Sequence, residues 1–333
     1  MKAAFITQTG PTHVIQYGDL PEPAIGPNDV LVRTRAVALN PIDTYIRAGN
    51  VKFNLPSPWI IGCDVAGVVE AIGSAVTGFR VGDRVWGSNQ SLFGRQGTFA
   101  ELCSIHEQWL YSIPPDVTDD SAAAGALVGI TAHLGLFLHG GLTAGEVVFV
   151  NGGTGGVGSA VTQLASAAGA TVITTVGSPE KSQLARASGA SHVIEYKSQD
   201  VDERLQSITR ETGPVKLWFE TLRTPTLERC IPLMAMRGRL IFMAGRDARP
   251  VFPLGPFYVK DLRAIGFAMF NASPDEQRVA ALSLNGSAAA GSFRPMIGMH
   301  FPLSASAEAH RVQEGSTIHC EGQLTGKIVL HPE

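Results

Sequence analysis

Alternating hydrophobic and polar positions characterise the N-terminal third of the chain. In "DVLVRTRAVALN", Val32, Thr34 and Ala36 fall on one face of an extended strand, while Arg33 and Arg35 fall on the other. Segments rich in Gly and Pro separate further short runs of Val, Ile and Thr: "GDLPEPAIGPND", "NLPSPWIIG" and "FRVGDRVWG". The pattern predicts a β-rich domain whose strands have one buried and one solvated face.

A different pattern begins at about residue 116. A helix rich in Ala, Leu and Gly is expected from Ser121 to His139, with Asp119 and Asp120 before it as candidate caps. Six strands follow: "VVFVN", "TVITTV", "HVIEY", "VKLWFET", "RLIFMAG" and "RAIGFAM". Helical segments such as "SPEKSQLARASG" and "TPTLERCIPLMAM" separate most of them. This alternation predicts an α/β fold with a parallel, doubly wound Rossmann sheet of the kind that binds dinucleotides.

The regular alternation of strands and helices ends near Met269, and the pattern of the remaining chain is less regular. We expect this tail to rejoin the first domain. The expected division is therefore one domain from residues 1–122 and 267–333, and a nucleotide-binding domain from residues 123–266.

Composition and charge narrow the classes of partner. A length of 333 residues with 44% hydrophobic content suits about two domains with full-sized cores. The formal net charge is −3, and acidic and basic residues are mixed along the chain. The sequence therefore shows no basic cluster of the kind that binds the phosphates of a nucleic acid. The start "MKAAFITQTG" lacks a signal-peptide pattern, and no run approaches the roughly 18 apolar residues that span a membrane. We expect a cytoplasmic protein with neither nucleic-acid nor membrane partners.

The four cysteines are far apart in the chain and form no C-x-x-C pair: Cys63, Cys103, Cys230 and Cys320. This spacing indicates neither a set of structural disulfide bonds nor a structural zinc site. We expect reduced, mostly buried thiols.

A glycine-rich turn, "NGGTGGVG", follows the first strand of the predicted parallel sheet. Gly153, Gly155 and Gly158 have G-x-G-x-x-G spacing, and the helix pattern "VGSAVTQLASAAG" follows with Gly169 as its C-cap. Glycine permits a tight turn, close approach of the backbone to a pyrophosphate, and close helix packing. The turn, including Gly156 and Val157 at the helix start, is therefore a predicted dinucleotide phosphate site.

The end of the second strand indicates which nicotinamide cofactor is used. A carboxylate there accepts hydrogen bonds from the ribose 2′-hydroxyl in NAD-binding proteins. Here Gly177 occupies that place, beside Ser178 and one helical turn before Lys181. Without the acid, a 2′-phosphate avoids a repulsion of roughly 4 kcal/mol at about 4 Å and a dielectric of about 20. The sequence predicts NADPH/NADP as cofactor, with Ser178 and Lys181 near the extra phosphate.

The chain resembles the medium-chain dehydrogenase/reductase superfamily, and more narrowly its zinc-independent quinone oxidoreductase branch, the zeta-crystallin-like proteins. The resemblance runs along the whole chain, through "ALNPIDTYIRAG", "GCDVAGVVEAIG", "FRVGDRVWG", "GTFAEL", "GGTGGVG", "TVGSPEK", "YVKDLRAIGFAMFNASPDEQ" and "GKIVL". It implies a GroES-like β-barrel catalytic domain built from both chain ends, with the Rossmann domain inserted between them.

The resemblance also allows a test for catalytic zinc. Alcohol-dehydrogenase relatives bind zinc through a Cys, a His and a second Cys, whose places are taken here by Asn40, Cys63 and Leu127. One thiol with an amide and an alkyl group cannot supply three zinc ligands. We expect no metal, and hence an acceptor that takes hydride without a Lewis acid, a quinone or an enone.

The resemblance implies site residues in both domains. Asn40, Asp43 and Tyr45 are the candidates for the substrate pocket: Asn40 and Tyr45 as hydrogen-bond donors, Asp43 as a residue that orients its neighbours. Each also has a local structural interpretation, as a turn, a helix cap and a packing residue. Resemblance adds further cofactor contacts: Thr131, Tyr196, Ala244, Gly245, Phe267, Ala268, Met269 and Lys327.

Two positions depart from the family pattern. Val51 stands where many relatives have an aromatic residue near the nicotinamide, although Phe53 is close in sequence, and His133 stands where relatives commonly have Tyr. A lone histidine on an apolar helix is more often packed and hydrogen-bonded than catalytic, although it can donate a proton near neutral pH.

The expected function is NADPH-dependent reduction of quinones or related conjugated carbonyl compounds by hydride transfer, without zinc. A reductase of enone or enoyl double bonds is the nearest enzyme alternative. The non-enzyme alternative is an RNA-binding or crystallin-like structural protein. The branch suggests a homodimer, and pairing of "RAIGFAMF" with its symmetry mate is a plausible contact.

Overall fold

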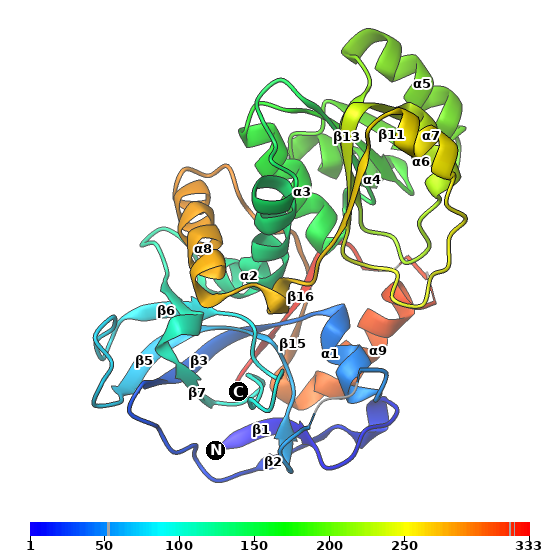
Figure 1. Cartoon of the computed structure of the whole chain (residues 1–333). Helices are drawn as coiled ribbons and strands as arrows, with labels where there is room; N and C mark the ends of the chain where they lie inside the picture. The colour runs from blue at the N-terminus through cyan, green and yellow to red at the C-terminus, as the bar shows by residue number, and fades with distance from the viewer. Residues whose placement is uncertain (52–53, 320, 323) are drawn as a thin grey trace. The chain divides into compact units, whose positions relative to one another are not determined.

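The computed structural model describes residues 1–51, 54–319, 321–322 and 324–333, which form two compact units (Figure 1). The first contains Met1–Leu127, Pro274–Ala289 and Pro295–Glu333, and the second contains Val128–Ser273 and Ala290–Arg294. The second unit thus extends to residue 273, beyond the expected limit of 266. At the expected limit the main chain is still hydrogen-bonded to the parallel sheet, because the Phe267 N–H donates to Phe242 O at 3.1 Å.

A seven-stranded sheet forms the body of the first unit. Its order is β15-β16-β3-β5-β6-β8, with β7 also paired with β3. The strands are β3 (Asp29–Leu39), β5 (Asp64–Ile72), β6 (Arg84–Gly87), β7 (Leu102–His106), β8 (Leu110–Ser112), β15 (Ile297–Pro302) and β16 (Lys327–His331). The C-terminal strand β16 is antiparallel to β3 and parallel to β15, so the tail completes the first unit (Figure 1).

The alternation in β3 is confirmed. Val32, Thr34 and Ala36 are buried, whereas Arg33 and Arg35 are exposed. A smaller sheet has the order β2-β1-β4. The other elements of this unit are β1 (Lys2–Ile6), β2 (Gln16–Asp19), β4 (Trp59–Ile60), α1 (Pro41–Arg47), α8 (Pro274–Ala289), α9 (Ser306–Thr317) and the 3₁₀ turns Thr12–Val14, Glu107–Trp109 and Leu303–Ala305.

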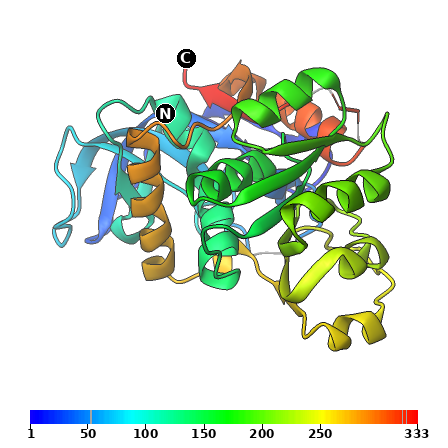
Figure 2. The same cartoon turned by 90° about the horizontal axis from the view of Figure 1, so that it is seen from above.

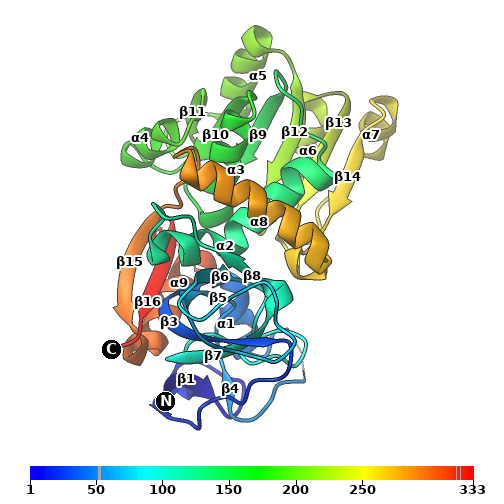
Figure 3. The same ribbon diagram turned by 90° about the vertical axis from the view of Figure 1, so that its left-hand side faces the viewer.

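The second unit contains a six-stranded sheet in which every described neighbour pair is parallel. Its order, β11-β10-β9-β12-β13-β14, is the doubly wound order, and the Rossmann prediction is confirmed (Figure 3). The strands are β9 (Val147–Asn151), β10 (Thr171–Val176), β11 (His192–Glu195), β12 (Val215–Glu220), β13 (Met234–Phe242) and β14 (Arg263–Gly266).

Helices cover both faces of this sheet (Figure 2). On one face, α4 (Pro179–Ala187) packs Ala185 against Val176 and Val193. On the other, α5 (Val201–Thr212) and α6 (Leu227–Leu233) pack against Phe149, Trp218 and other apolar strand residues. The remaining helices are α3 (Gly156–Ala167), α7 (Leu254–Val259) and a 3₁₀ turn, Met269–Asn271. The helix expected through Met236 ends at Leu233, because strand β13 already begins at Met234.

The helix expected from Ser121 to His139 starts two residues earlier, as α2 (Asp119–His133), and continues as a π-helical segment, Leu134–His139. It is long and apolar enough to cross a membrane by length and composition. Of its most apolar window, 78% is buried within the protein, the usual property of a core helix.

Three of the four cysteines fall within the described residues. Cys63, Cys103 and Cys230 are buried and unpaired, as predicted. Cys320 lies outside the described residues.

Candidate functional site

The carboxyl ends of the parallel strands bring most of the predicted cofactor residues to one edge of the second unit's sheet. The glycine turn follows β9, Gly177 and Ser178 follow β10, and Tyr196 follows β11. On the other half of the sheet, Ala244 and Gly245 follow β13, and Phe267, Ala268 and Met269 follow β14. Ligands of open parallel sheets bind at this edge, where the strand order reverses between β9 and β12.

The glycines of the turn have different spatial constraints. A Cβ added at Gly153 would clash with the Thr174 side chain, and one at Gly158 would clash with the carbonyl oxygen of Gly152. At Gly155, an added Cβ would come no closer than 3.6 Å to another described atom, leaving aside its chain neighbours. Gly153 and Gly158 are therefore required by the packing of the turn, whereas a Cβ at Gly155 would make an ordinary van der Waals contact with the Gly152 carbonyl oxygen and no clash.

Helix α3 begins immediately after Gly155. Its first residues are Gly156 and Val157, and its N-cap, Gly155, has no side chain to bond the N–H groups of the first turn. Such N–H groups and the positive end of the helix dipole attract phosphate oxygens. The residues present therefore fit a pyrophosphate group.

A polar network fixes the strand end that leads into the turn. The Asn151 amide donates to Glu220 at 3.1 Å and accepts from the Thr175 hydroxyl at 2.8 Å. Thr175 in turn accepts from the Gly152 N–H at 2.9 Å. Burial raises the pKa of Glu220, while hydrogen bonds from the Leu222 N–H and Asn151 hold it down. The sequence pattern did not indicate this network, because Asn151, Thr175 and Glu220 lie on three different strands.

Gly177, Ser178 and Tyr196 lie together at the ends of β10 and β11. A Cβ at Gly177 would approach the Tyr196 hydroxyl to 2.7 Å, and Tyr196 is exposed. Ser178 is the N-cap of α4 and accepts from the Lys181 N–H at 3.4 Å, so Lys181 sits in the first helical turn. Glu180, exposed beside them, has its pKa lowered chiefly by a hydrogen bond from Ser178.

The residues predicted near the nicotinamide are distributed over α2 and the strand ends. Thr131 is buried, and its hydroxyl has no hydrogen-bond partner among the described residues. Gly245 has a φ of +82°, and a Cβ there would approach Arg223 O to 2.8 Å. Phe267 packs on His139 with ring centroids 4.7 Å apart, and Met269 is buried.

His133 packs against Phe137 with ring centroids 4.8 Å apart. Burial lowers its pKa, so it is neutral near pH 7. The ring is packed, as the structural interpretation expects, but its Nδ1 has no hydrogen-bond partner among the described residues. Val51 is half-buried, and Phe53 lies outside the described residues.

The first unit contains a buried polar cluster, which we call the Asn40 cluster: Asn40, Asp43, Cys63, Asp64, Ser88 and Lys327. The Asn40 amide donates to Asp64 Oδ2 at 2.8 Å and to Ala38 O at 3.3 Å. The Lys327 ammonium donates to the Asn40 amide oxygen and, at 2.6 Å, to Leu39 O. Both polar groups of the Asn40 side chain are thus used within the chain.

The two carboxylates of the cluster have different partners. Asp64 accepts from Ser88 at 2.6 Å and lies 3.9 Å from the Lys327 ammonium. Asp43 Oδ2 accepts from the Asn40 N–H at 2.7 Å, which closes a capping box at the start of α1. Its Oδ1 has no hydrogen-bond partner in the part of the chain that the structure describes.

Burial dominates the electrostatics of this cluster. Burial raises the pKa of Asp43 to about 7. The negative charge of Asp64 also raises this pKa, whereas hydrogen bonds from Cys63 and from the Asn40 N–H lower it. Burial also raises the pKa of Asp64, against the attraction of Lys327, and lowers the pKa of Lys327. The cluster can therefore hold an Asp64–Lys327 ion pair beside an Asp43 that gains or loses a proton near neutral pH.

Tyr45 differs from its neighbours in α1. It is half-buried, whereas Asn40 and Asp43 are fully buried. Lys327 is predicted as a cofactor contact, but its ammonium is bonded inside the Asn40 cluster. Of the residues predicted in the first unit, the structure therefore brings Asn40, Asp43 and Lys327 into one network.

The positions that bind zinc in alcohol-dehydrogenase relatives carry a poor donor set. The Asn40 amide is engaged by Lys327 and Asp64, and Leu127 offers only an alkyl side chain. Burial, together with the charges of Asp43 and Asp64, raises the pKa of the Cys63 thiol well above its usual value. A thiol that resists ionisation is a weak metal ligand, so these residues do not fit a catalytic zinc ion.

Comparisons with known proteins agree with both units. Residues 26–115 match the alcohol dehydrogenase GroES-like domain, and residues 156–285 match the zinc-binding dehydrogenase family. The quinone oxidoreductase of Pseudomonas aeruginosa is 34% identical over 98% of both chains. That of Homo sapiens is 30% identical over 99% of this chain and 97% of its own. The structure of Escherichia coli quinone oxidoreductase complexed with NADPH superposes with a TM-score of 0.87, at 26% identity and full coverage of both chains.

Proposed function

The chain belongs to the quinone oxidoreductase branch of the medium-chain dehydrogenase/reductase superfamily, and we propose that it reduces quinones or related conjugated carbonyl compounds with NADPH, without zinc. The observation that carries the proposal is the start of α3, where no side chain caps the first N–H groups and an added Cβ at Gly155 would come no closer than 3.6 Å to another described atom. A pyrophosphate group fits there by shape and by charge. NADPH supplies a hydride when bound.

The corner formed by Gly177, Ser178, Lys181 and Tyr196 supports NADPH over NADH. Gly177 carries no carboxylate, and its Cα faces the Tyr196 hydroxyl. Lys181, in the first turn of α4, brings a positive charge to the same strand end. The Escherichia coli relative, which binds NADPH, has the same overall fold.

The remaining cofactor residues are proposed by their places at the strand ends. Gly153, Gly156, Val157 and Gly158 would form the backbone of the phosphate cradle. The hydroxyl of Thr131, which has no hydrogen-bond partner in the described part of the chain, would contact the nicotinamide end. So would the segments after β13 and β14: Ala244, Gly245, Phe267, Ala268 and Met269.

On the substrate side, the geometry favours different roles for the three predicted residues. Tyr45, half-buried, would donate a hydrogen bond to the acceptor oxygen on which negative charge develops. Asn40 and Asp43 would be positioning residues, because their hydrogen bonds hold the start of α1, the helix that carries Tyr45. Lys327 would balance the charge of Asp64, the carboxylate that accepts the hydrogen bond from Asn40.

We further propose a homodimer formed at β14, the edge strand of the sheet. An exposed apolar patch lies on and just before α7, and it contains Val251, Phe252, Leu254, Tyr258 and Val259. An edge strand beside such a patch offers main-chain pairing and apolar burial to a second copy. Light scattering should give twice the mass of the chain, and a monomeric mass at micromolar concentration would reject this assembly.

The function is tested by stopped-flow oxidation of NADPH against benzoquinones, naphthoquinones and alkyl enones, with NADH in parallel. We expect faster oxidation with at least one quinone, preference for NADPH, and no loss of rate after treatment with a zinc chelator. Reduction of NADP by a saturated alcohol, without oxidation of NADPH by any acceptor, would overturn the proposal. Activity with enones alone would instead select the double-bond reductase.

A further inference from the structure

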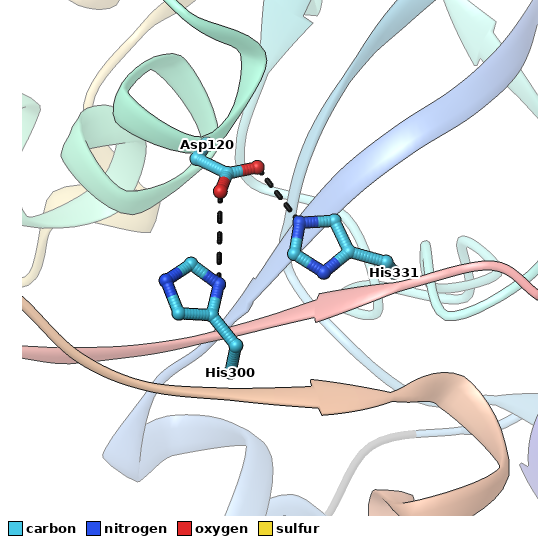
Figure 4. A group of neighbouring side chains, drawn as sticks. All are labelled: Asp120, His300 and His331. Atoms are coloured by element: carbon cyan, nitrogen blue, oxygen red, sulfur yellow. Dashed lines mark hydrogen bonds and ion pairs between the residues drawn. The ribbon is translucent and has the colours of Figure 1, made fainter.

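Three ligating side chains meet in the first unit, apart from the Asn40 cluster and the strand ends of the second unit. They are Asp120, His300 and His331 (Figure 4). Asp120 Oδ1 lies 2.8 Å from His331 Nε2, and Asp120 Oδ2 lies 3.6 Å from His300 Nδ1. One ligand atom from each residue can be chosen so that all lie within 4.8 Å of one another.

We infer that Asp120, His300 and His331 form a binding site for a divalent transition-metal ion, with Zn²⁺ as the best match. Two imidazoles and one carboxylate suit Zn²⁺, whereas Mg²⁺ and Ca²⁺ prefer oxygen ligands alone. The site is independent of the proposed reductase activity.

The spacing of the ligand atoms fits a tetrahedral ion. Bonds of about 2.0 to 2.2 Å in a tetrahedron place neighbouring ligand atoms about 3.3 to 3.6 Å apart. The separation of 3.6 Å between His300 Nδ1 and Asp120 Oδ2 lies at the upper end of that range. The separation of 2.8 Å between His331 Nε2 and the other carboxylate oxygen is a hydrogen-bond distance, which a bound ion would lengthen. Three protein ligands leave a fourth position for water, which the partial exposure of all three side chains permits.

The two histidines are placed by the pairing of β15 with β16. His300 is opposite Val329 and His331 is opposite Pro302, so the two imidazoles are diagonal neighbours on one face of this parallel pair. Their rings are nearly parallel, 9° apart in orientation, with centroids separated by 5.4 Å. Two hydrogen-bonded strands therefore hold the two nitrogen ligands.

The third ligand is placed by the first turn of α2. Arg84 in β6 bonds Asp119 at 2.6 Å and Val117 O at 2.7 Å, which ties the start of this helix to the sheet. The charge of Asp119 is paired with Arg84, while Asp120 faces the imidazoles. An ion held here would connect the start of α2 to both C-terminal strands.

Titration of the tag-free, full-length protein with Zn²⁺ after removal of bound metals tests the site. We expect one equivalent of Zn²⁺ to bind, and no Mg²⁺. His300→Ala should weaken Zn²⁺ binding at least about tenfold, since even outer-shell changes at metal sites cost that much. His300 is exposed and is the longer contact, so its loss should leave the fold intact, which circular dichroism verifies. His13→Ala, at an exposed histidine of the same unit, should bind Zn²⁺ as the wild type does.

Two further readouts distinguish Zn²⁺ bound at Asp120, His300 and His331 from Zn²⁺ bound elsewhere on the chain. Zn²⁺ should raise the Tm of the wild type and of His13→Ala by a few degrees, but not that of His300→Ala. Co²⁺ should give a visible spectrum without the thiolate charge-transfer band that binding at Cys63 would add. The inference is overturned if the wild type binds no Zn²⁺, or if His300→Ala and His331→Ala bind it with unchanged affinity, in which case Asp120 only bonds the two histidines.

Discussion

Lys327 in the last strand donates a hydrogen bond to the side chain of Asn40, a residue 287 positions earlier in the chain. The same ammonium lies 3.9 Å from the Asp64 carboxylate, and all three side chains are buried. The bond joins β16 to the start of α1, so the C-terminal strand supports the helix that carries Tyr45.

Replacing this lysine should destabilise the protein strongly. Lys327→Met leaves the Asp64 carboxylate buried without its charge partner, and we expect the free energy of unfolding to fall by about 3 to 5 kcal/mol. Urea unfolding measures the change, and a second substitution, Asp64→Asn, should restore part of the loss. Lys2→Met is the matched control, because Lys2 pairs with Asp19 at the surface and its loss should have no measurable effect. Equal effects of the two lysine substitutions would contradict the role of the buried pair.

The raised pKa of Asp43 predicts that this residue destabilises the protein as the pH rises. The folded chain keeps the proton of Asp43 up to about pH 7, whereas the unfolded chain releases it near the ordinary value of 3.8. The stabilisation of the folded state by protonated Asp43 is therefore fully present below about pH 4 and is lost as the pH rises through about 7. Asp43→Asn should remove this dependence, whose slope is at most about 1.4 kcal/mol per pH unit.

The measurement is the difference in unfolding free energy between the wild type and Asp43→Asn at several pH values. A difference is needed because His310 has the opposite effect. Burial lowers the pKa of His310 to about 3, so its contribution is lost as the pH falls from about 6.5 to about 3. Parallel profiles for the wild type and Asp43→Asn would show that Asp43 does not titrate as its environment indicates.

Two alanine substitutions in the glycine turn should separate binding from folding. Gly155→Ala should cost at most about 1 kcal/mol of stability, as expected for Ala at a helix N-cap, because its Cβ would come no closer than 3.6 Å to another described atom and would not clash. It should weaken NADPH binding about tenfold or more, since a displaced hydrogen bond to a charged group costs about 1.5 kcal/mol. Fluorescence titration with NADPH gives this affinity.

Gly158→Ala is the structural counterpart. Its Cβ would clash with the carbonyl oxygen of Gly152, and we expect a loss of about 1 to 3 kcal/mol in unfolding free energy. Unchanged NADPH affinity in Gly155→Ala would mean that the phosphates bind elsewhere.

A carboxylate at position 177 should reverse the choice of cofactor. Gly177→Asp places a negative charge where the 2′-phosphate is proposed to bind, and kcat/KM for NADPH should fall by up to about three orders of magnitude. The value for NADH should be no lower than in Gly177→Ala. Gly177→Ala controls for the contact of a new Cβ with Tyr196, which affects both cofactors alike. If Gly177→Asp lowers both values equally, the corner does not select the cofactor.

Local patterns were sufficient to predict the strands of the parallel sheet and the helix after the glycine turn. β9 is a short continuous apolar run that ends at the glycine turn, and α3 has a helical period that ends before Gly169, so each is recognised from its own residues. The end of α6 was harder to predict, because "IPLMAM" is an apolar run that suits a helix or a strand. Met234 pairs with Val215 in β12, so the segment from Met234 onwards forms a strand.

The polar clusters depend on contacts between distant parts of the chain. Asn40, Asp64 and Lys327 lie on three separate segments. Asp120 and His300 lie on two others, and His331 shares β16 with Lys327. No spacing within one segment indicates either group. The sequence placed Lys327 in a family motif but could not indicate that its ammonium is bonded to Asn40.

The insertion of β16 between β15 and β3 also has a consequence for synthesis of the chain. β3 emerges from the ribosome before the parallel sheet, but its partner strand, Lys327–His331, is made after it. All six strands of the parallel sheet lie between residues 147 and 266, within one continuous segment. The nucleotide-binding unit can therefore fold during translation, ahead of the N-terminal unit, which reverses the usual N-to-C order of cotranslational folding.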